Sequence, residues 1–306
     1  MKIGIGLPTT IAGCDRDLFL NWARAADEGL STLAVADLVT TPAWDALATL
    51  AATAAVTERV RLLTNVFVLP LRQAGLAAKQ AATIDVLSKG RLSLGVGAGG
   101  KKPVLFEITQ DANAHANYPD YAAAPADPKG RATRLDEQIA YMKQLWAGHA
   151  PMAGVPPVGP PPFQTGGPEL LAGTFAPAAI RRAASWCDGF ACFNHGANAE
   201  TVAEHFRMAS DAWREAGHAG VPRVVGSCLL ALGPHAAEGK ATYLAKHYEH
   251  LTPDGLARID GAIGPPGDDS ARRAAKAYAD IGFDELVFVP MIPTIDQVQR
   301  LLDLNL

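Results

Sequence analysis

The sequence predicts an α/β fold with a parallel sheet, either closed into a barrel or left open. Eight short apolar runs with the pattern of strands alternate with amphipathic helical segments along the 306 residues. Residues 60–69 and 91–97 flank a helical segment, and strands joined by such a crossover pair in parallel. No composition shift marks a domain boundary, so we expect one domain over residues 1–306. The alternation alone does not separate an eight-unit barrel from a doubly wound open sheet.

The elements are expected in a regular order. Strands are expected at residues 1–8, 31–37, 60–69, 91–97, 169–173, 189–193, 223–232 and 285–290. Helices are expected at residues 16–29, 42–57, 75–88, 131–146, 176–186, 198–216, around 243–251, 270–281 and from 294 onward. Asp15 and Thr41 are suited to N-cap two of these helices, and residues 294–297 have the pattern of a capping box.

Two irregular stretches interrupt the alternation. Residues 101–130 lose helical and strand periodicity, and residues 151–168 are rich in proline and glycine. Irregular stretches of this length in a compact domain are usually lids or binding loops. We therefore expect both stretches to lie over a barrel mouth, where they would wall the substrate, rather than to link domains.

Composition excludes several classes of function. The formal net charge of −4 provides no basic field for nucleic acid. The four cysteines show neither a CxxC pair nor zinc-ligand spacing, so we interpret them as free thiols in a reducing cytoplasm. No signal peptide and no apolar run of about 18 to 20 residues is present, which predicts a cytoplasmic protein without a membrane partner.

The unit from Val60 to Gly100 has two unusual features. Asn65 lies within a strand that should be dry, so its amide either joins a bulge or faces a ligand. The second strand ends in residues 95–100, Gly-Val-Gly-Ala-Gly-Gly, which satisfy a GxGxxG pattern. A Rossmann dinucleotide site is disfavoured, because no amphipathic helix opens on these glycines and no acid ends a following strand. The glycines instead remove side chains at the carboxyl end of a strand, where α/β proteins bind ligands, or they form only a tight turn.

Three segments of this unit carry a resemblance to a known family. They are residues 68–72 (VLPLR), 78–85 (AKQAATID) and 87–97 (LSKGRLSLGVG). This long, ungapped pattern resembles the central segment of the bacterial luciferase-like flavin monooxygenase family. The resemblance implies a TIM (β/α)8 barrel with insertion loops at the C-terminal mouth. It also implies FMN, or alternatively a deazaflavin coenzyme of the F420 type, bound at that mouth.

The resemblance assigns candidate site residues. Candidates for coenzyme binding are Asp37, Asn65, Val66, Gly97, Ala98, Gly99, Ala172, Gly173 and Thr174. Asn65-Val66 matches the position of a non-prolyl cis peptide that presses on the flavin ring in the family, and we predict the cis form here. Gly97 to Gly99 would lie against the ring or its ribityl chain. Ala172 to Thr174 deliver the chain to a helix N-terminus, which suits the flavin phosphate.

Proton transfer lacks an obvious agent. In relatives an acid at the position of Asp37 is often followed by histidine, whereas Leu38 follows it here. Asp37 and His195 are the remaining catalytic candidates, and Leu7, Asn194 and His195 are the candidates for substrate contact. Neither HxH nor HExxH occurs, so we expect no metal site.

These observations predict a flavin-dependent oxidoreductase. The preferred hypothesis is a two-component monooxygenase that receives reduced FMN from a separate flavin reductase and uses O2 on a small organic substrate. The first alternative is hydride transfer with the deazaflavin coenzyme. The second is a non-catalytic flavin-binding relative that has lost its proton-handling residue. The family also implies a homodimer formed through early helices.

Overall fold

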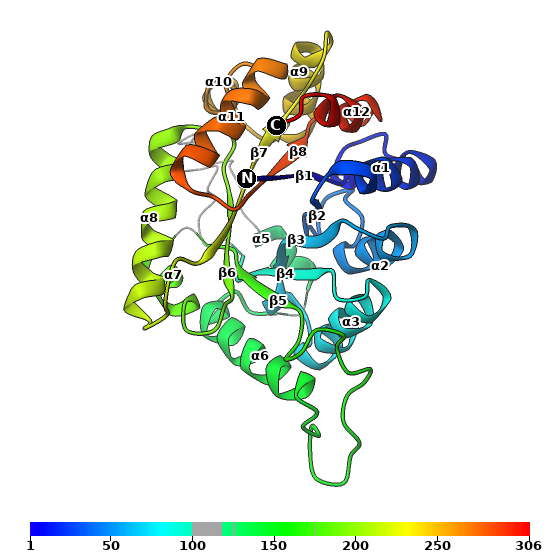
Figure 1. The fold of residues 1–306 in the computed structure, drawn as a ribbon, viewed down its shortest axis with the longest axis vertical. Helices are drawn as coiled ribbons and strands as arrows, with labels where there is room; N and C mark the ends of the chain where they lie inside the picture. The colour runs from blue at the N-terminus through cyan, green and yellow to red at the C-terminus, as the bar shows by residue number, and fades with distance from the viewer. Residues whose placement is uncertain (100–117, 125, 175) are drawn as a thin grey trace.

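The computed structural model describes residues 1–99, 118–124, 126–174 and 176–306. Its centre is a closed barrel of eight parallel strands in sequence order (Figure 1). The strands are β1 (Lys2–Gly6), β2 (Thr32–Val35), β3 (Arg61–Val68), β4 (Leu92–Gly97), β5 (Glu169–Ala172), β6 (Gly189–Phe193), β7 (Arg223–Leu230) and β8 (Glu285–Pro290). The barrel closes where β1 pairs with β8, with Lys2 opposite Glu285. The predicted TIM barrel is confirmed, and the open sheet is excluded.

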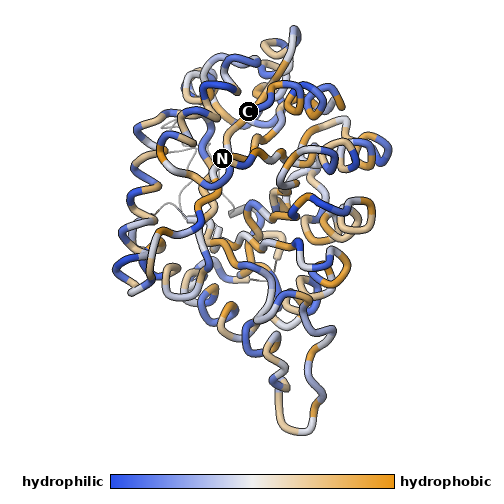
Figure 2. The backbone as a smooth tube through the Cα atoms, viewed as in Figure 1, coloured by the Kyte–Doolittle hydropathy of each residue, from blue (hydrophilic) through white to orange (hydrophobic). Residues whose placement is uncertain are grey.

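A ring of helices covers the outside of the barrel, and polar and apolar residues alternate along them (Figure 2). The ring consists of α1 (Arg16–Gly29), α2 (Ala46–Val56), α3 (Ala74–Leu87), α6 (Arg131–Trp146), α7 (Pro177–Ala183), α8 (Ala199–Glu215), α11 (Asp268–Ile281) and α12 (Asp296–Asp303). Short helices η1 (Pro8–Thr10) and η2 (Leu69–Leu71) follow β1 and β3, and α5 (Tyr118–Ala123) precedes α6. The helix expected around 243–251 is instead two helices, α9 (Ala236–His247) and α10 (Pro253–Ile263). Within the described ranges, every helix is too short or too polar to cross a bilayer.

Residues that alternate along the strands fill two separate cores. Outward-facing side chains such as Ile5, Leu33 and Leu62 pack with the helices. The inward-facing core consists of Ala34, Leu63, Leu171, Ala191, Val225 and Val287. Gly95 also faces inward, and a Cβ atom there would lie 2.1 Å from the carbonyl oxygen of Thr64. Glycine at this position therefore allows β3 and β4 to approach each other.

Helix starts differ from the prediction at two places. Asp15 caps α1 as predicted, because its Oδ1 accepts the N–H three residues later at 2.8 Å. Asp45 rather than Thr41 caps α2 in the same way, so that helix starts later than predicted. The predicted capping box at residues 294–297 is wrong. The Gln297 side chain is buried and pairs with the backbone N–H and carbonyl of Leu232, so it does not cap its own helix.

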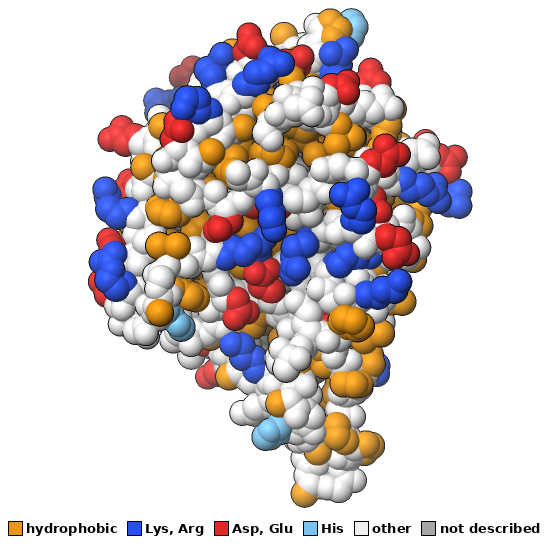
Figure 3. Space-filling model, viewed as in Figure 1, with side chains coloured by type: hydrophobic (Ala, Val, Ile, Leu, Met, Phe, Trp, Pro, Cys, Tyr) orange, Lys and Arg blue, Asp and Glu red, His pale blue; other side chains and the backbone are white. Residues whose placement is uncertain are grey.

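The expectation that residues 151–168 lie over the barrel mouth is also wrong. Helix α6 runs back along the barrel, so its link to β5 lies at the N-terminal end of the strands. The Gln164 Nε2 donates to Asp85 at the end of α3 and to the carbonyl of Leu92 at the start of β4. The segment projects away from the barrel (Figure 1), and Figure 3 shows hydrophobic side chains on it. The other stretch, 101–130, lies mostly outside the described residues.

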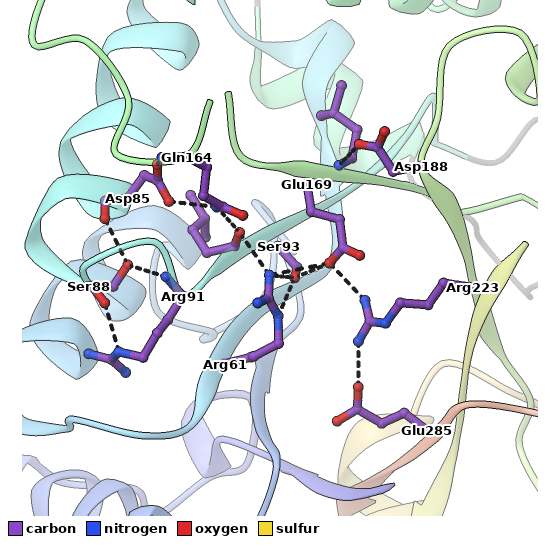
Figure 4. A network of polar contacts seen from close by, with 12 residues as sticks. Arg61, Asp85, Ser88, Arg91, Ser93, Gln164, Glu169, Asp188, Arg223 and Glu285 are labelled. Carbon is purple, nitrogen blue, oxygen red and sulfur yellow. Dashed lines mark hydrogen bonds and ion pairs between the residues drawn. The ribbon is translucent and has the colours of Figure 1, made fainter. Parts of the chain in front are cut away.

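A ring of charged side chains closes the N-terminal end of the barrel interior (Figure 4). Arg223 on β7 contacts Glu169 on β5 at 2.8 Å and Glu285 on β8 at 2.6 Å. Ser93 on β4 donates to Glu169 at 2.5 Å, and Arg61 on β3 lies 3.4 Å from the same carboxylate. The Glu285 side chain is 1% exposed, so it depends on its partners for stabilisation. Polar residues at this end of a TIM barrel serve stability rather than catalysis.

Replacing Arg223 with Met tests the importance of this ring. We expect Arg223→Met to lower the free energy of unfolding by about 2 kcal/mol, because two carboxylates lose their shared cation. The value is less than for a fully buried pair because the Arg223 side chain is 24% exposed. Urea unfolding would measure the change. Arg214→Met is the matched control, since Arg214 pairs with Asp211 at the surface and should cost less than about 0.5 kcal/mol. Equal losses in both variants would contradict a structural role for the ring.

Candidate active site

The C-terminal mouth of the barrel has an open half and a filled half. The last inward-facing positions at the ends of β1 and β4, and just after β5, are glycines: Gly6, Gly97 and Gly173. The equivalent positions on β6, β7 and β8 carry large apolar side chains, Phe193, Leu229 and Val289. Because glycine contributes no side chain, the first half leaves room for a ligand above the barrel core.

Val66 forms the floor of the open half. The Asn65-Val66 peptide is cis, as the family resemblance predicted, and the pairing of β3 with β4 shifts register between Thr64 and Phe67. The partly exposed Val66 side chain packs on the inner core. A Cβ atom on Gly97 would lie 3.0 Å from a Val66 methyl, and one on Gly173 would lie 2.4 and 2.8 Å from both methyls. The two glycines therefore accommodate Val66, which presents a small apolar side chain at the mouth.

Asn65 reaches across the barrel rather than into a ladder. Its Nδ2 donates to the Ser227 hydroxyl on β7 at 3.0 Å, and Ser227 donates to the Cys192 carbonyl at 3.3 Å. The Asn65 side chain remains partly exposed. A polar bridge therefore separates the open half of the mouth from the filled half, and Asn65 is accessible to a ligand there.

Asp37, predicted to contact coenzyme or substrate, is committed to an ion pair. Arg72 contacts its two oxygens at 2.5 and 2.6 Å, and the Val68 N–H donates to Oδ2 at 2.9 Å. The Arg72 guanidinium also lies over the Phe67 ring, 4.5 Å from its centroid. Burial raises the pKa of the Asp37 carboxyl from its ordinary value, while Arg72 and the Val68 N–H oppose that rise. This arrangement makes Asp37 a positioning residue for the end of β3.

Two side chains tie the backbone at the end of β4. The Tyr121 hydroxyl of α5 donates to the carbonyl of Ala98 at 2.9 Å, and Arg131 Nε donates to the carbonyl of Gly99 at 3.0 Å. Asp120 of α5 accepts bonds from both the N–H and the hydroxyl of Thr40 at 2.7 Å. Helix α5 therefore anchors the rim of the open half, and the predicted coenzyme residues Gly97 to Gly99 form part of that rim.

The predicted phosphate cradle lies beside this rim. Gly173 follows β5, and its N–H donates to the Val96 carbonyl at 2.7 Å, which places Ala172 to Thr174 next to the end of β4. Helix α7 begins at Pro177 rather than at residue 176, has seven residues and lacks a side-chain N-cap. Phosphate binding at Thr174 therefore stays a prediction. The N-terminus of so short a helix would stabilise a phosphate less than the sequence suggested.

Only one of the three predicted substrate contacts lies at the mouth. The Leu7 side chain faces outward and packs in the core between the barrel and its helices. The Asn194 Nδ2 donates to the Tyr278 hydroxyl on α11, outside the barrel wall. His195 instead lies 5.2 Å from the Phe193 ring in the filled half and is 7% exposed. Burial, with a smaller effect of His247, lowers the pKa of His195 to about 4, so its imidazole is neutral at pH 7.

Cysteine and metal chemistry have no visible site in the described part of the chain. The four cysteines are free thiols, as predicted, and burial raises the pKa of both Cys192 and Cys228 to about 12. No cluster of three or more histidine, cysteine, aspartate or glutamate side chains suited to a metal ion occurs among the described residues.

Comparison with known proteins identifies the family. The profile described as luciferase-like monooxygenase matches residues 1–281. The chain belongs to this family. An uncharacterised protein of Mycobacterium tuberculosis is 29% identical over 189 residues, which cover 59% of this chain and 60% of that protein. The F420-dependent glucose-6-phosphate dehydrogenase of Beutenbergia cavernae is 39% identical over 104 residues, or 34% of this chain and 27% of the enzyme.

Solved structures agree with the luciferase-like fold. Monooxygenase RslO1 from Streptomyces bottropensis superposes with a TM-score of 0.76 at 22% identity, covering 99% of this chain and 97% of that one. An F420-dependent secondary alcohol dehydrogenase has a TM-score of 0.72 at 15% identity, with coverage of 99% and 97%. Identities this low support the fold alone.

Sequence reasoning missed several residues of this luciferase-like mouth. Arg72 was visible in the VLPLR segment, and a cation four residues after Val68 could have been matched to Asp37. Ser227 carried no local signal, because its partner Asn65 lies 162 positions away. Tyr121 and Arg131, which hold the carbonyls of Ala98 and Gly99, lie in or beside a stretch that showed no periodicity.

Proposed function

We propose that this luciferase-like chain is an oxidoreductase that binds reduced FMN at the open half of the mouth. With O2, the coenzyme would supply the oxygenating chemistry for a small organic substrate, and a separate flavin reductase would supply the reduced coenzyme. The observation that carries the proposal is the floor made by Val66, Gly97 and Gly173. Its small apolar surface fits a flat ring, and no side chain from the ends of β4 and β5 obstructs it.

The chain's own residues would bind and orient the coenzyme. Val66 would support the face of the ring, and the partly exposed Asn65 amide would lie beside it, held by Ser227. Backbone groups of Ala98 and Gly99 would line the ring edge or ribityl chain, and Gly173 and Thr174 would contact the phosphate. Asp37 would act indirectly by fixing the backbone that follows Val66.

A deazaflavin coenzyme is the second candidate. The observation in its favour is the 104-residue segment that is 39% identical to an F420-dependent enzyme. The two coenzymes share a flat tricyclic ring and a ribityl phosphate, so the same floor would serve both. The reaction would then be hydride transfer, because the deazaflavin ring does not support oxygen chemistry.

Fluorescence titration with each coenzyme tests the choice. Purified protein would be titrated with FMN and F420, oxidised and reduced under anaerobic conditions. We expect reduced FMN to bind at least tenfold more tightly than reduced F420, and bound reduced FMN to consume O2 when substrate is present. Preferential binding of F420 would replace the first proposal by the second. Tight coenzyme binding without turnover over a broad substrate panel would favour a non-catalytic relative. This alternative is kept because Asp37 is held in an ion pair by Arg72, and because Leu38 stands where relatives often have a histidine.

We also propose a homodimer formed through α2 and α3. The outer face of α2 carries exposed alanines, and the adjacent α3 exposes Leu76 at 64% and Leu87 at 50%. Exposed leucines beside small, exposed alanines mark a candidate interaction site. We expect Leu76→Glu combined with Leu87→Glu to weaken dimerisation at least tenfold, measured by sedimentation velocity. Val221→Glu, at a 73% exposed loop position, is the control. A monomeric wild-type protein would contradict the proposal.

A further inference from the structure

Two consecutive side chains near the end of β3, Asn65 and Val66, both lie on the inner side of the barrel. Side chains along a strand normally alternate between the two faces of a sheet. Here the pairing of β3 with β4 shifts register, so Val66 packs on the inner core and Phe67 belongs to the outer core. Asn65 crosses the interior, since its Nδ2 donates to Ser227 on β7, on the opposite side of the barrel. A polar side chain therefore stands directly beside the apolar floor of the open half.

The hydrogen bonds of Ser227 fix which end of the Asn65 amide points toward it. Ser227 is 1% exposed, so its hydroxyl depends on protein partners. It donates to the Cys192 carbonyl at 3.3 Å, and a hydroxyl has only one proton to donate. The Asn65 atom that lies 3.0 Å from this hydroxyl must therefore be the donor Nδ2 rather than the acceptor Oδ1. Ser227 thus sets the orientation of the amide.

The other end of the amide, Oδ1, is open to a ligand. Among the described residues, the bond from Nδ2 to Ser227 is the only side-chain hydrogen bond of Asn65. Asn65 is partly exposed, and its Oδ1 is not one of the described buried side-chain atoms that lack a partner. An oxygen that has no protein partner and is not buried contacts solvent. The open half of the mouth therefore presents a fixed hydrogen-bond acceptor next to its floor.

A fixed acceptor selects ligands that offer a donor. An asparagine that turned freely would present either its NH2 group or its oxygen, and the bond to Ser227 removes this choice. Oxidised and reduced FMN differ in what they offer. Reduction adds hydrogen to N5 of the central ring and turns an acceptor nitrogen into an N–H donor. In a deazaflavin ring a carbon replaces this nitrogen, so reduction creates no N–H there.

We propose that Asn65 Oδ1 accepts a hydrogen bond from the N–H that reduction creates at N5 of FMN, and that Ser227 is the positioning residue that keeps Oδ1 turned toward the ring. This inference rests on the proposed function, because it needs FMN on the floor beside Asn65. Oxidised FMN directs a lone pair from N5 at the same oxygen, and two acceptors repel each other. The mouth therefore selects the reduced coenzyme, which is the form that a separate reductase would deliver.

The affinities of oxidised and reduced FMN, measured anaerobically, test this selection. We expect the wild-type protein to bind the reduced form about tenfold more tightly, because it gains one hydrogen bond and avoids one repulsion. A tenfold ratio raises the two-electron midpoint potential of bound FMN by about 30 mV over that of free FMN. Asn65→Leu and Ser227→Ala should each bring the ratio close to one. Ser185→Ala, at an exposed position after α7, is the control and should keep the wild-type ratio.

A double variant and an amide spectrum test whether Ser227 acts through Asn65. Adding Ser227→Ala to Asn65→Leu should change the affinity ratio no further than Asn65→Leu alone. In protein without coenzyme, the side-chain amide resonances of Asn65 are assigned by their loss in Asn65→Leu. We expect them to shift in Ser227→Ala and to stay in place in Ser185→Ala, and the remaining resonances show that the variants fold.

The outcomes separate this inference from the proposed function. Equal affinity of the wild-type protein for the two forms of FMN would overturn the inference and leave FMN binding intact. The same holds if Asn65→Leu and Ser227→Ala weaken both forms equally, because a merely structural role lowers affinity without moving the ratio or the midpoint potential. A protein that takes up neither form of FMN would overturn both the inference and the proposed function.

Discussion

Arg72→Met is expected to lower the free energy of unfolding by about 3 to 5 kcal/mol, the largest effect on stability that we predict. The substitution removes the guanidinium that contacts both oxygens of Asp37, whose side chain is only 3% exposed. The Val68 N–H alone then faces a buried carboxylate. A loss of this size is a large fraction of the 5 to 15 kcal/mol that typically stabilises a domain. Chemical unfolding followed by circular dichroism would measure it.

A second substitution tests whether the loss of stability comes from the buried, unpaired charge of Asp37. Combining Arg72→Met with Asp37→Asn removes that charge and retains an oxygen that can accept from the Val68 N–H. We expect the double variant to recover more than half of the lost stability, because a buried pair replaced by neutral groups is often nearly neutral. If Arg72→Met costs less than 1 kcal/mol, Asp37 does not depend on Arg72, and its role in fixing β3 would have to be abandoned.

Gly173→Ala is expected to weaken coenzyme binding at least tenfold. Its Cβ would lie 2.4 and 2.8 Å from the two Val66 methyls and 3.0 Å from the Val66 Cβ, so Val66 must move. Overpacking of this kind costs about 1 to 3 kcal/mol of stability, and the displaced valine would change the floor on which the ring lies. Coenzyme titration and thermal unfolding would measure the two effects.

Two further variants complete this experiment. Val66→Ala in the Gly173→Ala background removes both clashing methyls, and we expect it to restore most of the stability lost in Gly173→Ala. Gly75→Ala on α3 is the matched control, since beyond its own helix and chain neighbours no described atom lies within 4 Å of the added Cβ. That control should leave coenzyme affinity unchanged and raise stability by about 0.5 to 1 kcal/mol. Normal coenzyme affinity in Gly173→Ala would show that the ring does not lie on Val66.

Much of the fold could be predicted because its signals are local. Three elements were predicted with their observed bounds: β6 and β8 from their apolar runs, and α6 from its helical periodicity. Both patterns depend only on residues that are neighbours in the sequence. The closure of the barrel needed the family resemblance, because an open sheet produces the same alternation. The misplaced segment 151–168 shows the same limit, since its composition did not reveal at which end of the barrel it lies.

The candidate site was predictable where a local motif carried it. The cis peptide at Asn65-Val66 was predicted from the family resemblance, and the glycines near it were visible in residues 95–100. Other features depend on contacts between strands or helices that are distant in the sequence. These features are the ion pair of Asp37 with Arg72, the outward direction of Asn194 and the hydrogen bond from Asn65 to Ser227. Strand alternation, applied to β6, would have turned Asn194 outward once Ala191 and Phe193 were assigned to the interior.

The position of the coenzyme ring is tested most directly by methyl NMR of valine-labelled protein. The Val66 methyls would be assigned by their loss in Val66→Ala, and spectra would be recorded during titration with FMN and with F420. We expect the Val66 resonances to shift strongly upfield on binding, because the methyls would lie against the face of an aromatic ring. The exposed Val221 methyls should not move. Saturable binding that leaves the Val66 methyls unshifted would contradict a coenzyme bound on this floor.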